Sequence, residues 1–209
     1  MDSGRALQEL AERFGIGSAS EEAGRLLSFL RLLDKWNARV NLTSSTEWPA
    51  LESLFEEALW AARFYPRESA YHLDIGSGAG FPAIPMRILR PLMQLRLVES
   101  RARRAAFLET VVSELRLDGS EVVCGRIEDL LPSGALPRFD IVSWKGLRLR
   151  TEALELLLTA SRPETRFWLF HGPALPLEDP GQAQKSLRLL QRESLPRHPS
   201  WRLSIYAIR

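Results

Sequence analysis

Cysteine is almost absent from this chain of 209 residues, in which Cys124 is the only one. A single cysteine cannot form a disulfide within the chain or build a cysteine-based zinc cluster, and we expect no metal site. Nothing in the cysteine usage points to an oxidising compartment, so the cytoplasm is the expected location.

Long apolar runs are also lacking, although 45% of the residues are hydrophobic. No stretch approaches the roughly eighteen apolar residues that a membrane helix needs. Residues 1–10 contain two acids and no apolar segment of the kind that a secretory leader carries. We expect a soluble monomer without a membrane span, in which one globular domain carries a small extension.

Strong net charge is missing as well, because 28 basic and 26 acidic side chains leave a formal charge of +2. Twenty-five of the 28 basic residues are arginine. Arginine matches phosphate geometry better than lysine does, but the same usage also arises from genomic composition. The composition by itself is therefore a weak indication of nucleic-acid binding.

Leucines at helical spacing dominate the first third of the chain. The spacing predicts helices over residues 6–14, 21–40 and 48–64. Ser20 followed by Glu21 and Glu22 is typical of a helix start, because a hydroxyl can cap the first amides and acids favour the positive end of the helix. We expect residues 1–66 to form an N-terminal helical extension.

Short apolar runs alternate with helical segments in the rest of the chain. Strands are expected over residues 71–75, 95–99, 121–124, 139–144, 166–170 and 202–208. Helices are expected over residues 82–89, 101–115, 151–160 and 181–191. This alternation predicts that residues 67–209 form an α/β domain with a mostly parallel sheet and helices on both faces.

A glycine-rich segment, Asp74 to Gly80, follows the first expected strand. Ligands of open parallel sheets bind beyond the carboxyl ends of the strands, and this segment lies there. Gly76, Gly78 and Gly80 leave no side chain between backbone and ligand and permit positive φ. The segment therefore predicts a cofactor site, although a glycine turn at this point can also be purely structural.

Two acids indicate which cofactor the turn binds. The spacing Gly-x-Gly-x-Gly differs from the dinucleotide pattern Gly-x-Gly-x-x-Gly, whose third-glycine position is Phe81 here. Asp74 can accept a hydrogen bond from a cofactor ammonium, and Glu99, at the end of the second expected strand, can accept both ribose hydroxyls. Together these features favour S-adenosylmethionine over NAD, although an acid such as Glu99 can also be a solvated cap.

The sequence resembles one family, the RsmG (glucose-inhibited division protein B) methyltransferases, which methylate N7 of a guanine in 16S ribosomal RNA. The matching segments are Lys35-Trp36-Asn37, Asn41-Leu42-Thr43, Leu73 to Pro85, Leu97 to Ser100, Phe107-Leu108-Glu109 and Gly125 to Leu130. The pair Pro82 and Pro85 makes the longest of them the most specific. The resemblance implies a Rossmann-like class I methyltransferase fold with a seven-stranded sheet, and a partner that is 16S ribosomal RNA or the small ribosomal subunit.

The resemblance also implies where S-adenosylmethionine binds. It assigns the methionine end to the glycine turn and Phe81, the ribose to Glu99, and the adenine to Ile127 and Glu128. Glu128 alone is equally typical of a solvated acid at a helix start. The full set of expected cofactor residues is Asp74, Gly76, Ser77, Gly78, Gly80, Phe81, Glu99, Ser100, Ile127 and Glu128.

Basic and amide side chains near the strand ends are candidates for RNA contact. They are Asn37, Arg101, Arg103, Arg104, Lys145, Arg148 and Arg150. Arg103 and Arg104 can equally lie on a solvated helix face, and Asn37 and Asn41 can equally be helix caps. Lys145 and Asn41 are the candidates for positioning the acceptor. No catalytic base is expected, because the guanine N7 lone pair needs no deprotonation.

The chain departs from the family at positions that face the substrate. The usual Arg-His and Asp-Ser-Leu of the helix before the sheet are replaced by Ser53-Leu54 and Glu57-Ala58-Leu59. The usual Ser-Arg-Ala after the fourth strand is Trp144-Lys145-Gly146, and a Lys-Gly near the fifth strand is His171-Gly172. Three alternatives to the RNA enzyme stay open: a cofactor-binding protein without turnover, a small-molecule methyltransferase and a nucleotide-linked oxidoreductase.

Overall fold

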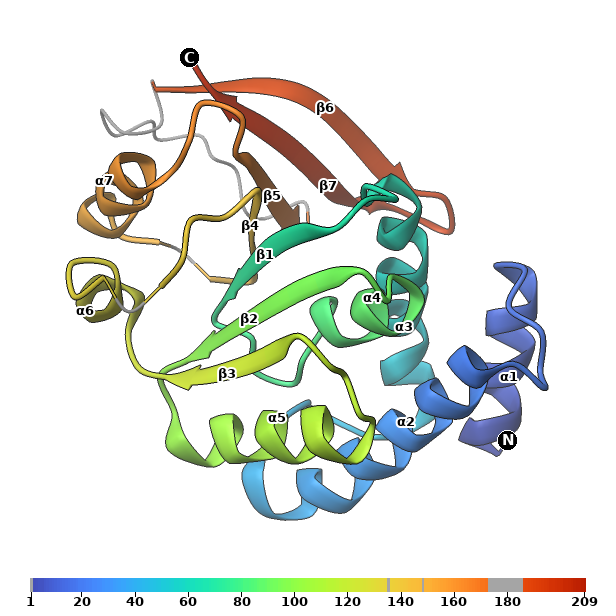
Figure 1. The fold of residues 1–209 in the computed structure, drawn as a ribbon. Helices are drawn as coiled ribbons and strands as arrows, with labels where there is room; N and C mark the ends of the chain where they lie inside the picture. Colours follow the sequence, from blue (N-terminus) through green and yellow to red (C-terminus); the bar gives the residue numbers. More distant parts are fainter. Residues whose placement is uncertain (1, 135, 148, 173–185) are drawn as a thin grey trace.

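Three helices precede the first strand in the computed structural model, which describes residues 2–134, 136–147, 149–172 and 186–209 (Figure 1). They are α1 (Ser3–Arg13), α2 (Glu21–Val40) and α3 (Trp48–Ala61), and the 3₁₀ turn η1 (Ala62–Phe64) follows α3. The hydroxyl of Ser20 accepts a hydrogen bond from Ala23 N at 3.1 Å, which confirms the predicted start of α2. The third predicted helix ends three residues early, because η1 tightens its last turn.

A single seven-stranded sheet forms the centre of the fold. Its strands are β1 (Ala70–Ile75), β2 (Met93–Glu99), β3 (Ser120–Cys124), β4 (Ile141–Lys145), β5 (Arg166–His171), β6 (Leu187–Leu195) and β7 (His198–Ile208). They lie in the order β3-β2-β1-β4-β5-β7-β6. The strands β1 to β5 are parallel, and β7 is antiparallel to both β5 and β6. The predicted mostly parallel sheet is confirmed.

The helix predicted over residues 181–191 is wrong in its described part. Residues 187–191 belong to the edge strand β6, which pairs with β7, and residues 181–185 lie outside the described residues. Leu189 and Leu190 are both exposed, so β6 lacks the alternation of a half-buried strand, and its leucine spacing predicts a helix instead. Pairing with β7 decides the conformation here, which local propensity does not reveal.

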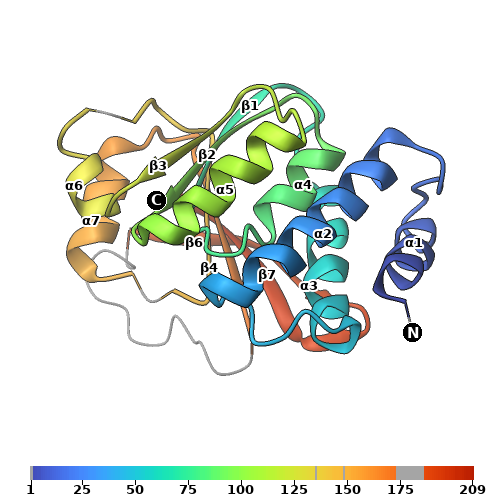
Figure 2. The same cartoon turned by 90° about the horizontal axis from the view of Figure 1, so that it is seen from below.

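Helices cover both faces of the sheet, as the alternation predicts (Figures 1 and 2). Helices α1, α2 and α3 lie on one face with α4 (Ala83–Leu89) and α5 (Ala102–Glu114). The other face carries α6 (Ile127–Leu130) and α7 (Thr151–Ala160). None of the helices in the described part of the chain is long and apolar enough to cross a membrane.

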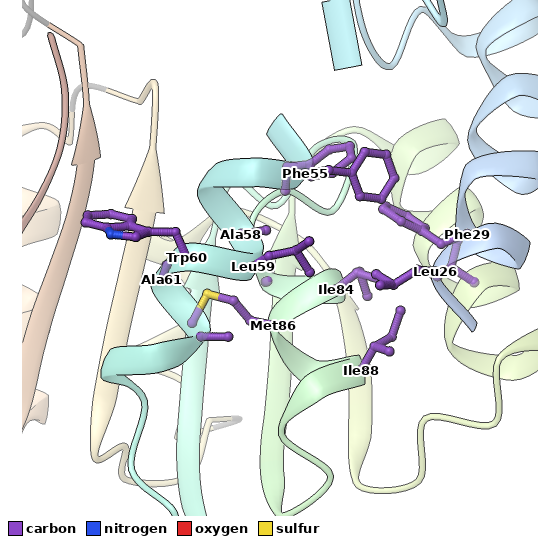
Figure 3. Close-up of a cluster of buried hydrophobic side chains, with 14 of the residues drawn as sticks. Leu26, Phe29, Phe55, Ala58, Leu59, Trp60, Ala61, Ile84, Met86 and Ile88 are labelled. Atoms are coloured by element: carbon purple, nitrogen blue, oxygen red, sulfur yellow. The ribbon is translucent and has the colours of Figure 1, made fainter. Parts of the chain in front are cut away.

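Aromatic side chains join the first helices to the segment after β1. The Phe29 ring of α2 lies 5.2 Å from that of Phe81 and 6.5 Å from that of Phe107 in α5, and Phe55 of α3 lies 5.0 Å from Phe81. Figure 3 shows side chains of α2 and α3 meeting Ile84 of α4. The helices before β1 thus share one core with the sheet. The domain division at residue 66 stays a prediction.

We predict that Phe29→Ala lowers the free energy of unfolding by about 3–5 kcal/mol, because it leaves a cavity among three fully or nearly buried rings. Urea unfolding followed by circular dichroism measures this difference. Leu92→Ala is the control, since Leu92 is 55% exposed and its truncation should cost less than about 0.5 kcal/mol. A loss of under about 1 kcal/mol for Phe29→Ala would contradict a shared core.

Candidate active site

The carboxyl ends of β1 to β4 meet at one edge of the sheet and open into a cavity of about 580 Å³. This volume is within the usual range for small-molecule sites. The residues that end or follow these strands line it: Ile75 and Gly76, Glu99 and Ser100, Gly125, and Lys145 and Gly146. The expected position of a ligand beyond the strand ends is therefore the position of a real cavity.

The positions of the turn after β1 require glycine for different structural reasons. Gly76, Gly78 and Gly80 all have positive φ, at 71°, 52° and 82°. A Cβ on Gly80 would lie 2.8 Å from Ile84 Cγ1 and 3.3 Å from Leu108, so this glycine permits α4 and α5 to pack closely. Gly78 has only loose neighbours, and a Cβ there would enter the space beside Glu99. Gly78 therefore leaves room for a ligand, whereas the absence of a side chain at Gly80 permits close packing in the core.

Backbone amides of the turn already have partners. Gly76 N and Ser77 N both donate to Val98 O, at 2.8 and 3.2 Å, and Gly80 N donates to Ser77 O at 2.7 Å. Gly78 N donates to the carboxylate of Glu99 at 2.9 Å. A phosphate cradle needs several free amides that converge on the anion. These four backbone amides are not free to bind a phosphate, which disfavours a dinucleotide as the ligand.

Glu99 joins the turn to the next helix. Its buried carboxylate accepts Gly78 N through Oε2 and Arg101 N, at the start of α5, through Oε1 at 2.8 Å. A carboxylate has about four acceptor positions, so two remain after these bonds. Glu99 is thus a cap, but a buried one rather than the solvated cap that one interpretation of the sequence held, and it still has acceptor capacity facing the cavity.

A buried hydrogen-bond chain supports the start of the turn from below. Ser143 Oγ donates to Asp74 Oδ1 at 2.6 Å. Because the single hydroxyl proton is used in that bond, His72 Nε2 carries a proton and donates to Ser143 Oγ at 2.8 Å. Burial raises the pKa of Asp74 to about 6, against the opposing effect of the hydrogen bond from Ser143. Burial lowers the pKa of His72 to about 3, so this imidazole is neutral.

Lys145 contacts an acid of the first helices rather than open solvent. It ends β4, its side chain is 16% exposed, and its ammonium pairs with Glu57 of α3. The ammonium also lies 5.4 Å from the ring centroid of Trp201 in β7. Two of the departures from the family pattern, at residues 57 and 145, thus meet as one ion pair. Glu57 Oε1 is buried without a hydrogen-bond partner in the described chain.

The environment of Glu128 lowers the pKa of its carboxyl group, whereas that of Asp74 raises it. It lies in the first turn of α6, and its carboxylate binds Arg150 at 2.9 Å. A hydrogen bond from its own backbone amide and the bond from Arg150 lower its pKa. Glu128 is therefore ionised where it faces the cavity. His171, another departure, pairs with Ser204 Oγ at 3.0 Å and is a satisfied strand-end imidazole.

The two asparagines act as caps. Asn37 Oδ1 accepts Leu42 N and Thr43 N, both at 2.8 Å, and so closes the loop after α2. Asn41 ends α2 in the left-handed region at φ 50°, and its carbonyl accepts Arg104 Nη2 at 2.9 Å. Cap geometry was one of the two interpretations of these asparagines, and it is present at both.

Nine of the expected site residues line the cavity, and the others lie elsewhere. Those that line the cavity are Gly76, Glu99, Ser100, Ile127, Glu128, Arg101, Arg104, Lys145 and Arg150. Those beside or beneath it are Asp74, Ser77 and Gly78, whereas Gly80 and Phe81 pack into the core. Arg103 is exposed on α5, and Arg148 lies outside the described residues.

Two further residues at the site, Ser143 and His72, have no motif that marks them in the sequence, and Glu57 is marked only as a departure from the family pattern. Ser143 and His72 support Asp74, and Glu57 holds Lys145. Ser143 is opposite Asp74 in the register of β1 and β4. Only knowledge that these two strands are neighbours would have identified it, because the strands are separated by two other strands in the sequence.

We predict that Asp74→Asn stabilises the protein relative to wild type by a margin that grows with pH. A raised folded pKa favours the neutral acid, so this contribution to stability is present below about pH 4 and is lost as the pH rises through about 6. The gain of the variant should increase by about 1–2 kcal/mol between about pH 5 and pH 8.

Urea unfolding at both pH values measures the margin. Asp129→Asn is the matched control, because the Asp129 carboxylate is exposed in a helix of the same cavity edge. A margin for Asp74→Asn that is independent of pH would show that Asp74 is not a buried titrating acid.

Comparison with known proteins identifies the family. The family GidB, described as rRNA small subunit methyltransferase G, matches residues 22–196. Ribosomal RNA small subunit methyltransferase G 1 of Syntrophobacter fumaroxidans is 34% identical over 152 residues, which cover 70% of this chain and 68% of that protein. Ribosomal RNA small subunit methyltransferase G of Syntrophotalea carbinolica is 32% identical over 168 residues, covering 80% and 77%.

The fold is also similar to the folds of solved methyltransferase structures. A SAM dependent methyltransferase from Aquifex aeolicus, 15% identical, aligns with a TM-score of 0.58 over 87% of this chain and 97% of that one. At this identity the likeness concerns the fold, which is that of class I methyltransferases. With the family match over most of its length, the chain belongs to GidB, the rRNA small subunit methyltransferase G family of S-adenosylmethionine-dependent methyltransferases.

Proposed function

We propose that this protein transfers the methyl group of S-adenosylmethionine to N7 of a guanine in 16S ribosomal RNA. The observation that carries the proposal is the cavity itself, which is lined by the acids Glu99 and Glu128, by Gly76 of the glycine turn and by Lys145 at the end of β4. The proposal includes a cytoplasmic monomer that acts on the small ribosomal subunit or its RNA. None of the described contacts favours the alternatives without turnover or with a small-molecule acceptor.

The residues at the cavity suit the three parts of the cofactor: the adenine, the ribose and the methionine. Ile127 and Glu128, with Ser100, would hold the adenine, and the remaining lone pairs of Glu99 would accept the ribose hydroxyls. Gly76 and Gly78 would lie against the methionine, since a Cβ on Gly78 would occupy that space. Asp74 and Ser77 are buried residues of the turn itself, and Gly80 and Phe81 pack into the core.

Positioning is the main task of the protein in this reaction. When bound, S-adenosylmethionine supplies a methyl group on a sulfonium. Guanine N7 presents a lone pair, so the chain needs no base and has to hold the acceptor in line. Lys145 ends β4 at the cavity and would contact the acceptor, with Asn41 positioning it from the loop after α2.

Exposed cations at and beside the cavity would bind RNA phosphates. Arg101 is the N-cap of α5, Arg103 lies in the first turn of that helix, and Arg126 is the N-cap of α6. Each carries an arginine fork, which suits phosphate oxygens. Asn37 would support this surface indirectly, by closing the loop that follows α2.

We expect tritium from labelled S-adenosylmethionine to appear in purified small ribosomal subunits or their naked RNA, at N7 of one guanine when the label is mapped. Gly78→Val should abolish both cofactor binding and transfer, because its side chain enters the ligand space. Gly134→Val is the matched control, since Gly134 also has a positive φ, of 69°, but has open space around it. Tight cofactor binding without label in either RNA would refute the proposal.

We also predict that the ion pair of Lys145 and Glu57 affects stability and transfer differently. Lys145→Met alone leaves Glu57 buried without its partner and should cost about 3–5 kcal/mol. Adding Glu57→Gln should restore most of this stability, measured by urea unfolding. The double variant should still transfer methyl groups to RNA at least roughly 10-fold more slowly, by kcat/KM for RNA. Transfer at the wild-type rate would exclude Lys145 from acceptor binding.

A further inference from the structure

The amino-acid end of the proposed cofactor carries a carboxylate that needs a partner. In many anion sites backbone amides at a turn supply it. Here the amides of Gly76, Ser77, Gly78 and Gly80 already donate to Val98 O, to Ser77 O or to Glu99. The acids Glu99 and Asp74 also lie at this turn, so the local charge opposes a further anion. With these four amides engaged, a side-chain cation at the turn is the partner that the local charge favours.

Five basic side chains line the cavity in the described chain: Arg101, Arg104, Arg126, Lys145 and Arg150. Arg150 is bound to Glu128, and Arg126 acts on the same carboxylate, so both lie at the adenine end. Lys145 is paired with Glu57. Arg101 is exposed. The half-buried Arg104 is the remaining cation.

Arg104 lies directly over the glycine turn. A Cβ on Gly78 would be 3.6 Å from Arg104 Nη1 and 4.0 Å from Glu99 Oε2, so the guanidinium and the carboxylate flank one space above Gly78. The other amine, Nη2, donates to Asn41 O at 2.9 Å. This bond to the end of α2 orients the guanidinium before any ligand arrives, and an arginine has five N–H donors, so others remain.

We propose that Arg104 binds the α-carboxylate of S-adenosylmethionine and thereby makes the site selective for a cofactor that has one. The inference rests on the proposed function, because it assumes that this cofactor occupies the cavity. Charge-assisted bonds from a guanidinium suit a carboxylate in geometry and strength. Through Asn41, the same side chain ties the loop after α2 to the cofactor, so the first helices contribute to cofactor selectivity.

Calorimetry of the full chain with two ligands tests the assignment. The ligands are S-adenosylmethionine and decarboxylated S-adenosylmethionine, which keeps the sulfonium and the ammonium and lacks only the carboxylate. Arg104→Gln should weaken the first by about 10–100-fold, the range for hydrogen bonds to a charged group. It should change the affinity for the second by less than about threefold. Arg104→Lys should be intermediate for the first ligand, because it keeps the charge and loses the fork.

Arg31→Gln is the matched control, since Arg31 is exposed on α2 and does not line the cavity, and it should leave both affinities unchanged. An equal loss for both ligands in Arg104→Gln would overturn the assignment, because Arg104 would then only shape the turn. No loss for either ligand would overturn it as well. If wild type binds S-adenosylmethionine and methylates RNA in those cases, the proposed function survives. If wild type does not bind S-adenosylmethionine, both proposals fail.

Discussion

The carboxylate of Glu99 holds the site together. It is buried at the end of β2 and accepts one amide from the glycine turn and one from the start of α5. Hydrogen bonds to a charged group are stronger than neutral ones, and leaving such a group unpaired inside a protein is costly. The turn and the helix are therefore fixed relative to the strand by one residue. The position of Arg104, in the first turn of α5, follows from this constraint.

The pleat of the sheet decides which side chains meet the first helices. His72 and Asp74 of β1 alternate with Leu73 and Ile75, which pack on the other face. Ser143 and Lys145 of β4 follow the same alternation, so Lys145 reaches Glu57 of α3. The helices before β1 thus supply an ion-pair partner to the proposed acceptor side, and Asn41 supplies a carbonyl to the proposed cofactor side. They belong to the site as much as to the core.

Local patterns in the sequence were sufficient for much of the fold. Helical leucine spacing predicted α2 with its bounds, and the strand and helix alternation predicted a parallel sheet with two covered faces. The same kind of pattern failed at β6, because an exposed edge strand has no alternation and takes its conformation from β7. For the site, Glu99 and Gly76 were predicted at the cavity and lie there, whereas Phe81 lies in the aromatic core.

The sequence by itself determined the parts that depend on neighbours in the chain: the helices, five parallel strands, and a glycine turn bracketed by Asp74 and Glu99. The tertiary structure decided the contacts that orient these parts. Ser143 reaches Asp74 across 69 residues, Lys145 reaches Glu57 across 88, and Arg104 reaches Asn41 across 63. The physical reason is that side-chain partners so far apart are selected by strand order and helix packing, which no local periodicity encodes.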